Sequence, residues 1–253
     1  MSPLRASVAV LVVLAAAGSA GADVILSAER LNTSLKNMQR LQRQMREGTP
    51  EAQASATFDL GVEADALATL LSDEVAAHGM QERPLLELAL RRTREIGVRV
   101  EWMVAKDRFF YDGEAFRRYL ARAPRGPRAA ESAFWLLETE FYQTSGGDPK
   151  AIQPAIERKK AFLARHASFP LAPDVGVFLA IDYRDLFRHH RDKGDRAQAA
   201  RYEKLARQQF RRVAGRHPDT EQGRIAAEML RRLDAEARAP AAKDARPSSG
   251  ARD

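Results

Sequence analysis

The sequence contains no cysteine, which excludes a disulfide framework, a thiol nucleophile, a thiolate zinc site and a cysteine-linked lipid anchor. Aromatic residues make up only 7% of the chain, and after the first stretch no apolar run approaches the roughly 20 residues that span a bilayer. A glycine-rich phosphate loop and a G-x-S-x-G nucleophile motif are also missing. Because 45% of the 253 residues are hydrophobic and 30% are charged, the chain can still bury a core. We expect a soluble, mostly helical protein.

Residues 1–22 have the pattern of an export signal. Arg5 is the only charged residue before Asp23, and residues 6–17 form an apolar segment that is too short to span a membrane. The tripeptide A-G-A at positions 20–22 then provides an A-x-A cleavage site. The pattern favours a cleaved signal peptide over an uncleaved anchor, and it predicts a periplasmic or secreted protein.

The net charge is +7, from 41 lysine and arginine residues against 34 aspartate and glutamate residues. The two signs are interleaved along the chain: Arg91 and Arg92 follow Glu87, and Arg184 follows Asp182. A nucleic-acid-binding surface would instead gather basic residues and exposed aromatic residues on one face. The pattern indicates a solvated surface with many ion pairs, and no nucleic-acid partner is expected.

The first helical segment has one apolar seam. From Val24 to Met45 the seam residues recur at alternating steps of four and three, and the helix is expected to end near Gly48. A second helix is expected over about residues 51–78, so residues 23–80 are predicted to form an N-terminal helical hairpin. The alternative is a structural homo-oligomer, in which the seam forms a coiled coil between copies of the chain.

A longer pattern then repeats over residues 81–235. Three prolines close the repeated units: Pro124, Pro170 and Pro218. Turns with glycine and aspartate lie upstream of them, at 111–113, 145–148 and 193–195. Each unit is predicted to be a helix that ends in a glycine cap, a helix capped by aspartate, and a proline that opens the next helix. Bulky pairs such as Phe109–Phe110 would close the first helix, and no strand is expected, the run Val98–Met103 being assigned to a helix.

One amphipathic hairpin cannot bury its apolar stripe alone, whereas stacked hairpins share a continuous core. The segment from Pro218 to about Ala235 has apolar residues at a spacing of four and is expected to cap the stack. Residues 236–253 are rich in alanine, proline, serine and charge, and they are predicted to be a disordered tail.

The C-terminal part of this region resembles a known family. The resemblance is carried by Gly194–Ala197, Ala199, Ala206, Phe210 and the string His217–Thr220. These residues are similar to the tetratricopeptide-repeat family, specifically to the long-helix repeats of bacterial envelope proteins, although the prolines are 46 and 48 residues apart and the standard repeat has about 34 residues. The resemblance implies an all-α fold of helical hairpins stacked as an α-solenoid. It also implies a concave face, lined by the first helix of each hairpin, that binds a peptide or a partner protein.

Few residues are candidates for chemistry. Asp182, Asp185 and His189 are spaced so that they share one helix face, as metal ligands would. Arg184 and Arg188 on the same helix favour ordinary ion pairs instead. We therefore expect no metal site and no cofactor.

A rival hypothesis is an envelope enzyme that acts on peptidoglycan through a glutamate, because some such enzymes carry helical superstructures. The only Glu-Ser pair of this kind is at Glu131, and the sequence around it does not fit the catalytic motif of lytic transglycosylases. We therefore expect no enzyme and assign no catalytic residue.

The sequence thus predicts an exported, non-catalytic scaffold that binds an envelope protein or peptide. The partner would contact non-apolar positions of the first helices of the repeats. The candidate partner-binding residues are Arg99, Lys106, Glu138, Gln143, Asp182, Arg184 and Asp185.

Overall fold

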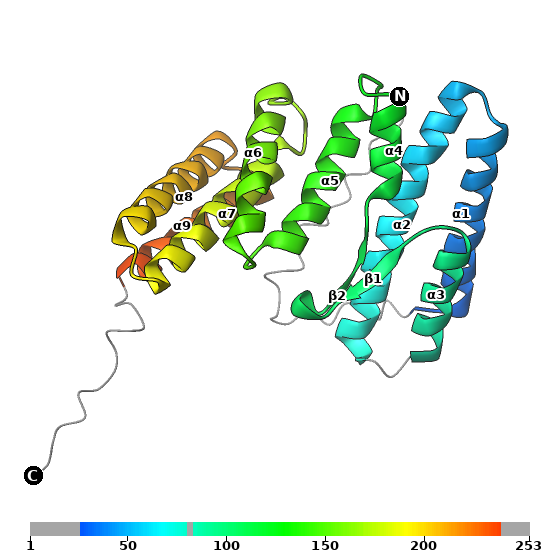
Figure 1. Cartoon of the computed structure of the whole chain (residues 1–253), viewed down its shortest axis with the longest axis horizontal. Helices are drawn as coiled ribbons and strands as arrows, with labels where there is room; N and C mark the ends of the chain where they lie inside the picture. The colour runs from blue at the N-terminus through cyan, green and yellow to red at the C-terminus, as the bar shows by residue number, and fades with distance from the viewer. Residues whose placement is uncertain (1–25, 80–82, 239–253) are drawn as a thin grey trace, which may run out of the picture.

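The computed structural model describes residues 26–79 and 83–238 (Figure 1). In these ranges the chain forms nine α-helices, one short 3-10 helix and one two-stranded sheet. The elements in chain order are α1 (Ala28–Glu47), α2 (Pro50–His78), α3 (Arg83–Glu95), β1 (Val100–Met103), η2 (Val104–Lys106), β2 (Arg108–Tyr111), α4 (Glu114–Arg122), α5 (Ala129–Thr144), α6 (Pro149–Arg165), α7 (Ala172–Asp192), α8 (Arg196–Arg216) and α9 (Glu221–Arg238). The chain is predominantly helical, as the sequence predicts. No helix within the described ranges is long and apolar enough to cross a membrane.

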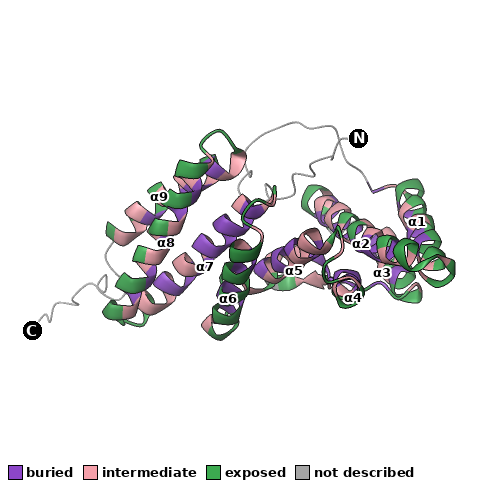
Figure 2. Ribbon diagram, turned by 90° about the horizontal axis from the view of Figure 1, so that it is seen from above, coloured by how far each residue is buried: buried purple, intermediate pink, exposed green. Residues whose placement is uncertain are grey.

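The helices lie side by side, approximately in chain order (Figure 1). From α4 to α9 each helix packs against the next, and α7 also contacts both α5 and α9. Seen from above, the helices follow a bent path, and their buried faces point at neighbouring helices (Figure 2). Each helix in this part therefore buries its apolar stripe against its neighbours in the chain. The predicted export signal at 1–22 lies outside the described residues.

The predicted N-terminal hairpin is confirmed. Ser27 and Thr49 cap α1 and α2 with their hydroxyl oxygens, and Pro50 begins α2. Four apolar residues of the α1 seam are buried, and α1 packs on α2: Leu31, Leu35, Met38 and Leu41. Because the seam is covered within the chain, it is not free for the coiled coil that the sequence left open.

The connection between α3 and α4 is a β-hairpin, not a helix. β1 and β2 pair antiparallel, with Val100 opposite Tyr111. The helical assignment of Val98–Met103 is therefore wrong, and Phe109–Phe110 lie in a strand instead of closing a helix. The segment is rich in valine and aromatic residues, which fit a pleated, half-buried surface better than a helix.

Strand β2 is held against α2. The Phe109 N–H donates to Ser72 Oγ of α2 at 2.8 Å. At the end of the strand, the Tyr111 hydroxyl accepts the Ala115 N–H of α4 at 2.6 Å. Both aromatic side chains are buried. The tip of the hairpin, which carries Lys106, therefore lies beside the end of α5.

Two of the three predicted glycine and aspartate turns are confirmed. Gly146 and Gly194 have φ angles of +68° and +76°, values that favour glycine. Asp148 and Asp195 cap α6 and α8, and each carboxylate accepts a backbone N–H of the helix, at 2.9 and 3.1 Å. The third turn, at Gly113, also precedes a helix but follows a strand.

The prolines have a different place from the predicted one. Pro124, Pro170 and Pro218 lie in the loops before α5, α7 and α9, not in the first turns of these helices. A tight turn still separates the proline from the helix, as where the Thr220 N–H donates to the His217 carbonyl at 3.1 Å. Pro124 and Pro218 thus limit α4 and α8, because a proline disfavours helical geometry at the residue before it, whereas α6 already ends at Arg165, well before Pro170.

The predicted start of the tail at residue 236 is wrong. Helix α9 continues to Arg238, because its last turns have ionic partners on α7. The Glu236 carboxylate pairs with the Arg188 guanidinium through two hydrogen bonds, one of them 2.9 Å from Nε to Oε2. Residues 239–253 lie outside the described residues.

An aromatic cluster joins the two halves of the core. The N-terminal half packs around α2 and the C-terminal half around α7. Between them, Phe134 and Phe141 of α5 stack on Phe178 of α7, with ring centroids 6.5 and 4.3 Å apart. Helices α5 and α7 are therefore the packed joint between the halves, and any surface between the halves depends on these two helices.

Replacing Gly61 with alanine is expected to lower the free energy of unfolding by about 1–3 kcal/mol. A Cβ at Gly61 of α2 would lie 2.6 Å from a carbon of the Phe116 ring, and that ring is fully buried. Gly215→Ala is the matched control: no atom outside the neighbouring backbone of α8 lies within 4 Å of a Cβ built there, and alanine suits a position in the last turn of the helix. Urea unfolding followed by circular dichroism measures the free energy of unfolding of both variants. If Gly61→Ala were as stable as Gly215→Ala, the close packing of α2 on α4 would be contradicted.

Candidate functional site

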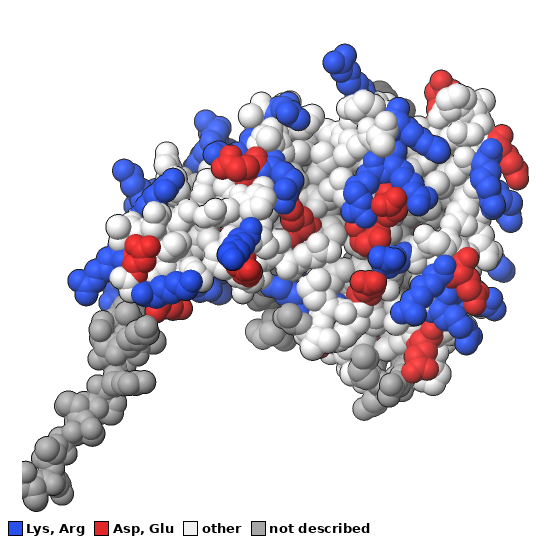
Figure 3. Space-filling model, in the orientation of Figure 1, with Lys and Arg blue, Asp and Glu red and all other residues white. Residues whose placement is uncertain are grey.

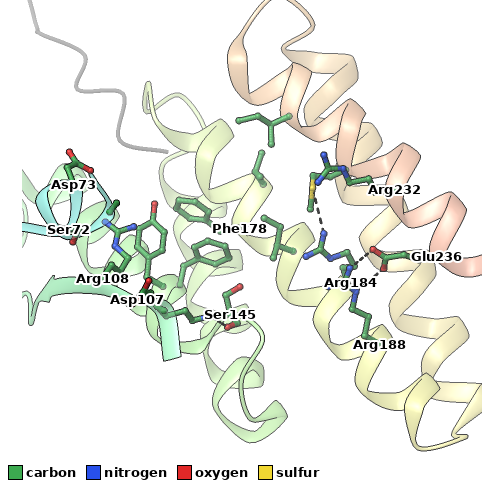
Figure 4. A pocket seen from close by; sticks show the side chains of 18 of the residues that line it. Ser72, Asp73, Asp107, Arg108, Ser145, Phe178, Arg184, Arg188, Arg232 and Glu236 are labelled. Carbon is green, nitrogen blue, oxygen red and sulfur yellow. Dashed lines mark hydrogen bonds and ion pairs between the residues drawn. The ribbon is translucent and has the colours of Figure 1, made fainter. Parts of the chain in front are cut away.

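A groove with a volume of about 860 Å³ opens between the two halves of the molecule. One wall, the hairpin wall, comes from the end of α2, η2, β2 and the end of α5. The other, the α7–α9 wall, comes from α7 and α9. Figure 4 shows charged residues of the two walls on opposite sides of Phe178. The volume lies within the range of about 300–1,000 Å³ that is typical of ligand pockets.

The floor of the groove is apolar. Phe141 and Phe178 stack there, and Val177, Ile181 and Met229 continue the apolar surface. The α7 residues of the floor and wall recur at steps of three and four and therefore share one face of the helix. This face of α7 changes from apolar to basic toward the C-terminal end of the helix.

The hairpin wall presents two basic side chains. The Arg108 guanidinium lies 4.4 Å from the ring centroid of Tyr142 and 5.1 Å from that of Phe110. The Lys106 ammonium donates a hydrogen bond to the Ser145 carbonyl at the end of α5. The turn after α5 and the tip of the hairpin are thereby joined.

The α7–α9 wall is mainly cationic. Arg184 and Arg188 come from α7, and Arg232 and Glu236 come from α9 (Figure 4). Glu236 is the paired carboxylate of Arg188, and the hydrogen bonds between them tie α9 to α7. The wall is thus braced by a bidentate ion pair, and Arg184 and Arg232 add further guanidinium groups to the groove lining.

A second cavity, of about 10 Å³, lies between α2, β2 and α5, and its volume is about that of one water probe. Asp65 and Glu138 line it, and Glu138 is only 5% exposed. Burial, together with the carboxylates of Asp65 and Asp174, raises the pKa of Glu138 to about 8, and Arg108 opposes the shift. Burial also raises the pKa of Asp65 to about 6, against Arg108. These carboxyl groups lie in the interior and do not line the open groove.

Two of the predicted partner-binding residues line the groove. Lys106 lies on the hairpin wall and Arg184 on the α7–α9 wall. Asp185 is mostly buried, and its carboxylate accepts the Gly146 N–H at 2.6 Å, so that it holds the turn between α5 and α6. Whether any of these residues contacts a partner stays a prediction.

The surface positions predicted for Glu138 and Asp182 are wrong. Both side chains are buried, Glu138 beside Asp65 and Asp182 in an ion pair with Lys159. Helical periodicity cannot show whether an acidic residue is exposed to solvent or is buried against a charged residue of another helix.

Two further candidates are exposed but lie away from the groove. Arg99 precedes β1, outside any helix, and pairs with Glu101 at 3.7 Å. Gln143 is near the end of α5 and does not line the groove.

Sequence reasoning missed six of the eight charged residues that line the groove, among them Arg108, Arg188 and Glu236. Arg108 was hidden because the hairpin was not expected, and Glu236 because it was assigned to the tail. Arg188 was assigned to ordinary ion pairs with the acidic residues of its own helix, whereas its partner is Glu236 of α9. Its place one turn after Arg184 on α7 is a signal for a shared basic wall.

The charged surface also agrees with the interleaved sequence. On the face shown in Figure 3, basic and acidic side chains mostly lie next to each other. Examples are Arg118 with Glu114 at 2.9 Å and Arg92 with Glu95 at 3.0 Å. This face does not carry the continuous basic patch that a nucleic-acid binder would present.

Within the described residues, no group of three histidine, aspartate or glutamate side chains is placed to hold a metal ion. Glu131, the residue of the peptidoglycan hypothesis, pairs with Arg128 at 2.6 Å and does not line the groove. No known family model matches the chain, and no curated protein matches it. Fold and groove together define a predominantly helical protein with a concave site that has an apolar floor and charged walls.

Proposed function

We propose that this chain is an exported, non-catalytic helical-repeat scaffold that binds a protein or peptide partner of the cell envelope in the groove. The groove itself carries the proposal: its floor is aromatic and aliphatic, and a small number of charged groups stand on both walls. This combination is typical of recognition sites, in which the apolar surface supplies affinity and the polar groups supply orientation.

The arrangement of the C-terminal helices supports a repeat scaffold. Helices α5, α7 and α9 line the groove, whereas no residue of α6 or α8 does. The α5–α6 and α7–α8 turns have the same glycine and aspartate chemistry. Alternate helices on one face are what a stack of helical hairpins produces, and such stacks use that face for binding.

The charges of the groove support recognition more than turnover. One of its carboxylates, Glu236, is held by Arg188. Burial raises the pKa of Glu236, but the hydrogen bond and charge of Arg188, together with the charges of Arg184 and Arg191, outweigh burial and leave the pKa below the usual value. A general acid or base for catalysis would need a pKa near the working pH. The pattern at 1–22 supports an exported protein, and therefore a partner in the envelope.

Blocking the groove tests this proposal. Ala76 and Ala235 are exposed alanines on opposite walls, so Ala76→Trp and Ala235→Trp add bulk without removing a contact. Ala200→Trp, on the exposed face of α8 and outside the groove lining, is the matched control. The full chain with a C-terminal tag is produced in its own cells, cross-linked there and purified, and the bound proteins are identified.

The expected result is a discrete protein that survives a high-salt wash with the wild type and with Ala200→Trp. Its recovery should fall at least fivefold with either groove variant. Equal recovery with all variants would remove the groove from the proposal, and no specific protein with the wild type would contradict the scaffold itself.

A further inference from the structure

Arg184 has a mostly buried guanidinium without a close carboxylate partner among the described residues. Its side chain is 13% exposed, and its Nη2 lies 3.7 Å from Asp185 Oδ1, too far for a good hydrogen bond. Its Nη1 lies 3.6 Å from Met229 Sδ, and its buried Nε has no hydrogen-bond partner. Burial, and then the neighbouring Arg188, lower the pKa of Arg184. A buried cation with unsatisfied donors is unfavourable until an anion reaches it.

The nearby carboxylates satisfy Arg184 only in part, through the long contact with Asp185 Oδ1. The Asp185 carboxylate accepts the backbone N–H of Gly146 through its other oxygen, and both oxygens of Glu236 are bonded to Arg188. Five lysine or arginine residues line the groove against three aspartate or glutamate residues, so the lining has a positive excess. The groove therefore attracts a ligand with negative charge.

The surroundings of Arg184 also require an apolar group on that ligand. Ile181 lies one turn before Arg184 on the same face of α7, Phe178 lies one turn further back, and Met229 faces them from α9. A carboxylate bound to Arg184 would place its neighbouring group over this apolar surface.

The opposite wall favours a peptide over a small anion. Asp73 and Asp107 stand there, and their carboxylates can accept backbone N–H groups of a chain that crosses the groove. A free inorganic anion would fill only a small part of a groove of about 860 Å³.

We propose that the groove selects an acidic peptide segment, in which a carboxylate side chain stands next to a large apolar side chain, and that Arg184 receives the carboxylate. This inference rests on the proposed function and adds to it the chemistry of the partner. Arg184 is a specificity-determining residue in this proposal, because its guanidinium would contact the ligand directly.

Fluorescence anisotropy with defined peptides tests the inference. The probe is a labelled nine-residue peptide with phenylalanine, glutamate and leucine at its centre and glycine and serine around them. Two matched probes replace the glutamate with glutamine or with lysine. The proteins are the full-length wild type, Arg184→Met, which keeps an aliphatic stem, and Arg211→Met, which changes an exposed arginine of α8 outside the groove lining.

The wild type and Arg211→Met should bind the glutamate peptide at least tenfold more tightly than the glutamine peptide, and lysine should weaken binding further. Arg184→Met should reduce the glutamate preference to less than twofold while retaining binding of the glutamine peptide. In the charge-reversed pair, Arg184→Glu should prefer the lysine peptide. Circular dichroism shows whether each variant is folded. If Arg184→Glu does not fold, the conservative Arg184→Met variant still tests the role of the guanidinium.

Other outcomes separate this inference from the proposed function. Equal binding of all three peptides, abolished by Ala235→Trp, would overturn the acidic selection and leave the groove as a binding site. Failure of every peptide while a partner is still captured from cells would also overturn it. Two results would show that the groove binds this chain itself and not an acidic partner. One is binding of a peptide with the sequence of residues 239–253, and the other is a dimer that Ala235→Trp abolishes. If no peptide binds and no partner is captured from cells, both the acidic selection and the proposed function are contradicted.

Discussion

Replacing Lys159 with methionine is expected to lower the free energy of unfolding by about 3–5 kcal/mol. The Lys159 ammonium of α6 lies 2.6 Å from Asp182 Oδ2 of α7, and both side chains are completely buried. The ammonium also lies 5.5 Å from the centroid of the Phe141 ring. Methionine fills most of the space but leaves the Asp182 carboxylate in the interior without its cation. Urea unfolding at neutral pH, followed by circular dichroism, measures the loss.

Lys160, next to Lys159 in the sequence, and Asp182, the partner of Lys159, supply the controls. Lys160→Met removes a half-exposed ion pair with Glu157 from the same helix, and its expected effect is less than about 1 kcal/mol. The double variant Lys159→Met with Asp182→Leu should recover most of the loss, because an apolar pair no longer carries the cost of removing charges from water. If the double variant is no more stable than Lys159→Met alone, an unpaired buried charge is not the cause.

Stability should fall as the pH rises, and Glu138→Gln should remove part of this fall. The pKa of Glu138 is about 8 in the folded chain, mainly because of burial, and 4.5 is its ordinary value. An acid whose pKa is raised by folding contributes its full stability below its unfolded pKa and loses it as the pH rises through the folded pKa. Between pH 5 and pH 8 the wild type should therefore lose on the order of 3 kcal/mol through this one group.

Glutamine cannot ionise, so Glu138→Gln should resemble the wild type near pH 5 and be more stable than it near pH 8. Asp65 and Asp174, whose pKa values burial raises to about 6, contribute a fall of the same sign in both proteins. Glu131→Gln, on the same helix but in a partly exposed pair with Arg128, should leave the pH dependence unchanged. Parallel curves of stability against pH for the wild type and Glu138→Gln would show that Glu138 is not protonated inside the protein.

The helices and their ends could be predicted because their causes are local. Ser27, Thr49, Asp148 and Asp195 cap helices through bonds to backbone groups two or three residues away, and Gly194 supplies the positive φ of the following turn. The α1 seam has a sequence period that matches a helix, and the next segment along the chain covers it. Such features depend on residues that are close in the sequence.

The β-hairpin could not be predicted in the same way. Val100 and Tyr111 lie opposite each other, and Ser72 of α2 supplies a hydrogen bond to the backbone of β2. The apolar residues of this segment also fit a helical period, so contacts with α2 decide between the two structures. Tertiary packing overrides a weak local preference in such short segments.

Local sequence features account for the predominantly helical chain, for the helix ends at the turns after α5 and α7, for the pairing of the N-terminal helices and for the interleaved charges. The packing of the helices, by contrast, sets which charges are buried and which face the groove. Asp182 and Arg184 are two residues apart on α7, yet one meets Lys159 in the interior and the other lines the groove. The physical reason is that burial depends on the helices packed against each face, and the partners come from residues 23 to 48 positions away in the chain.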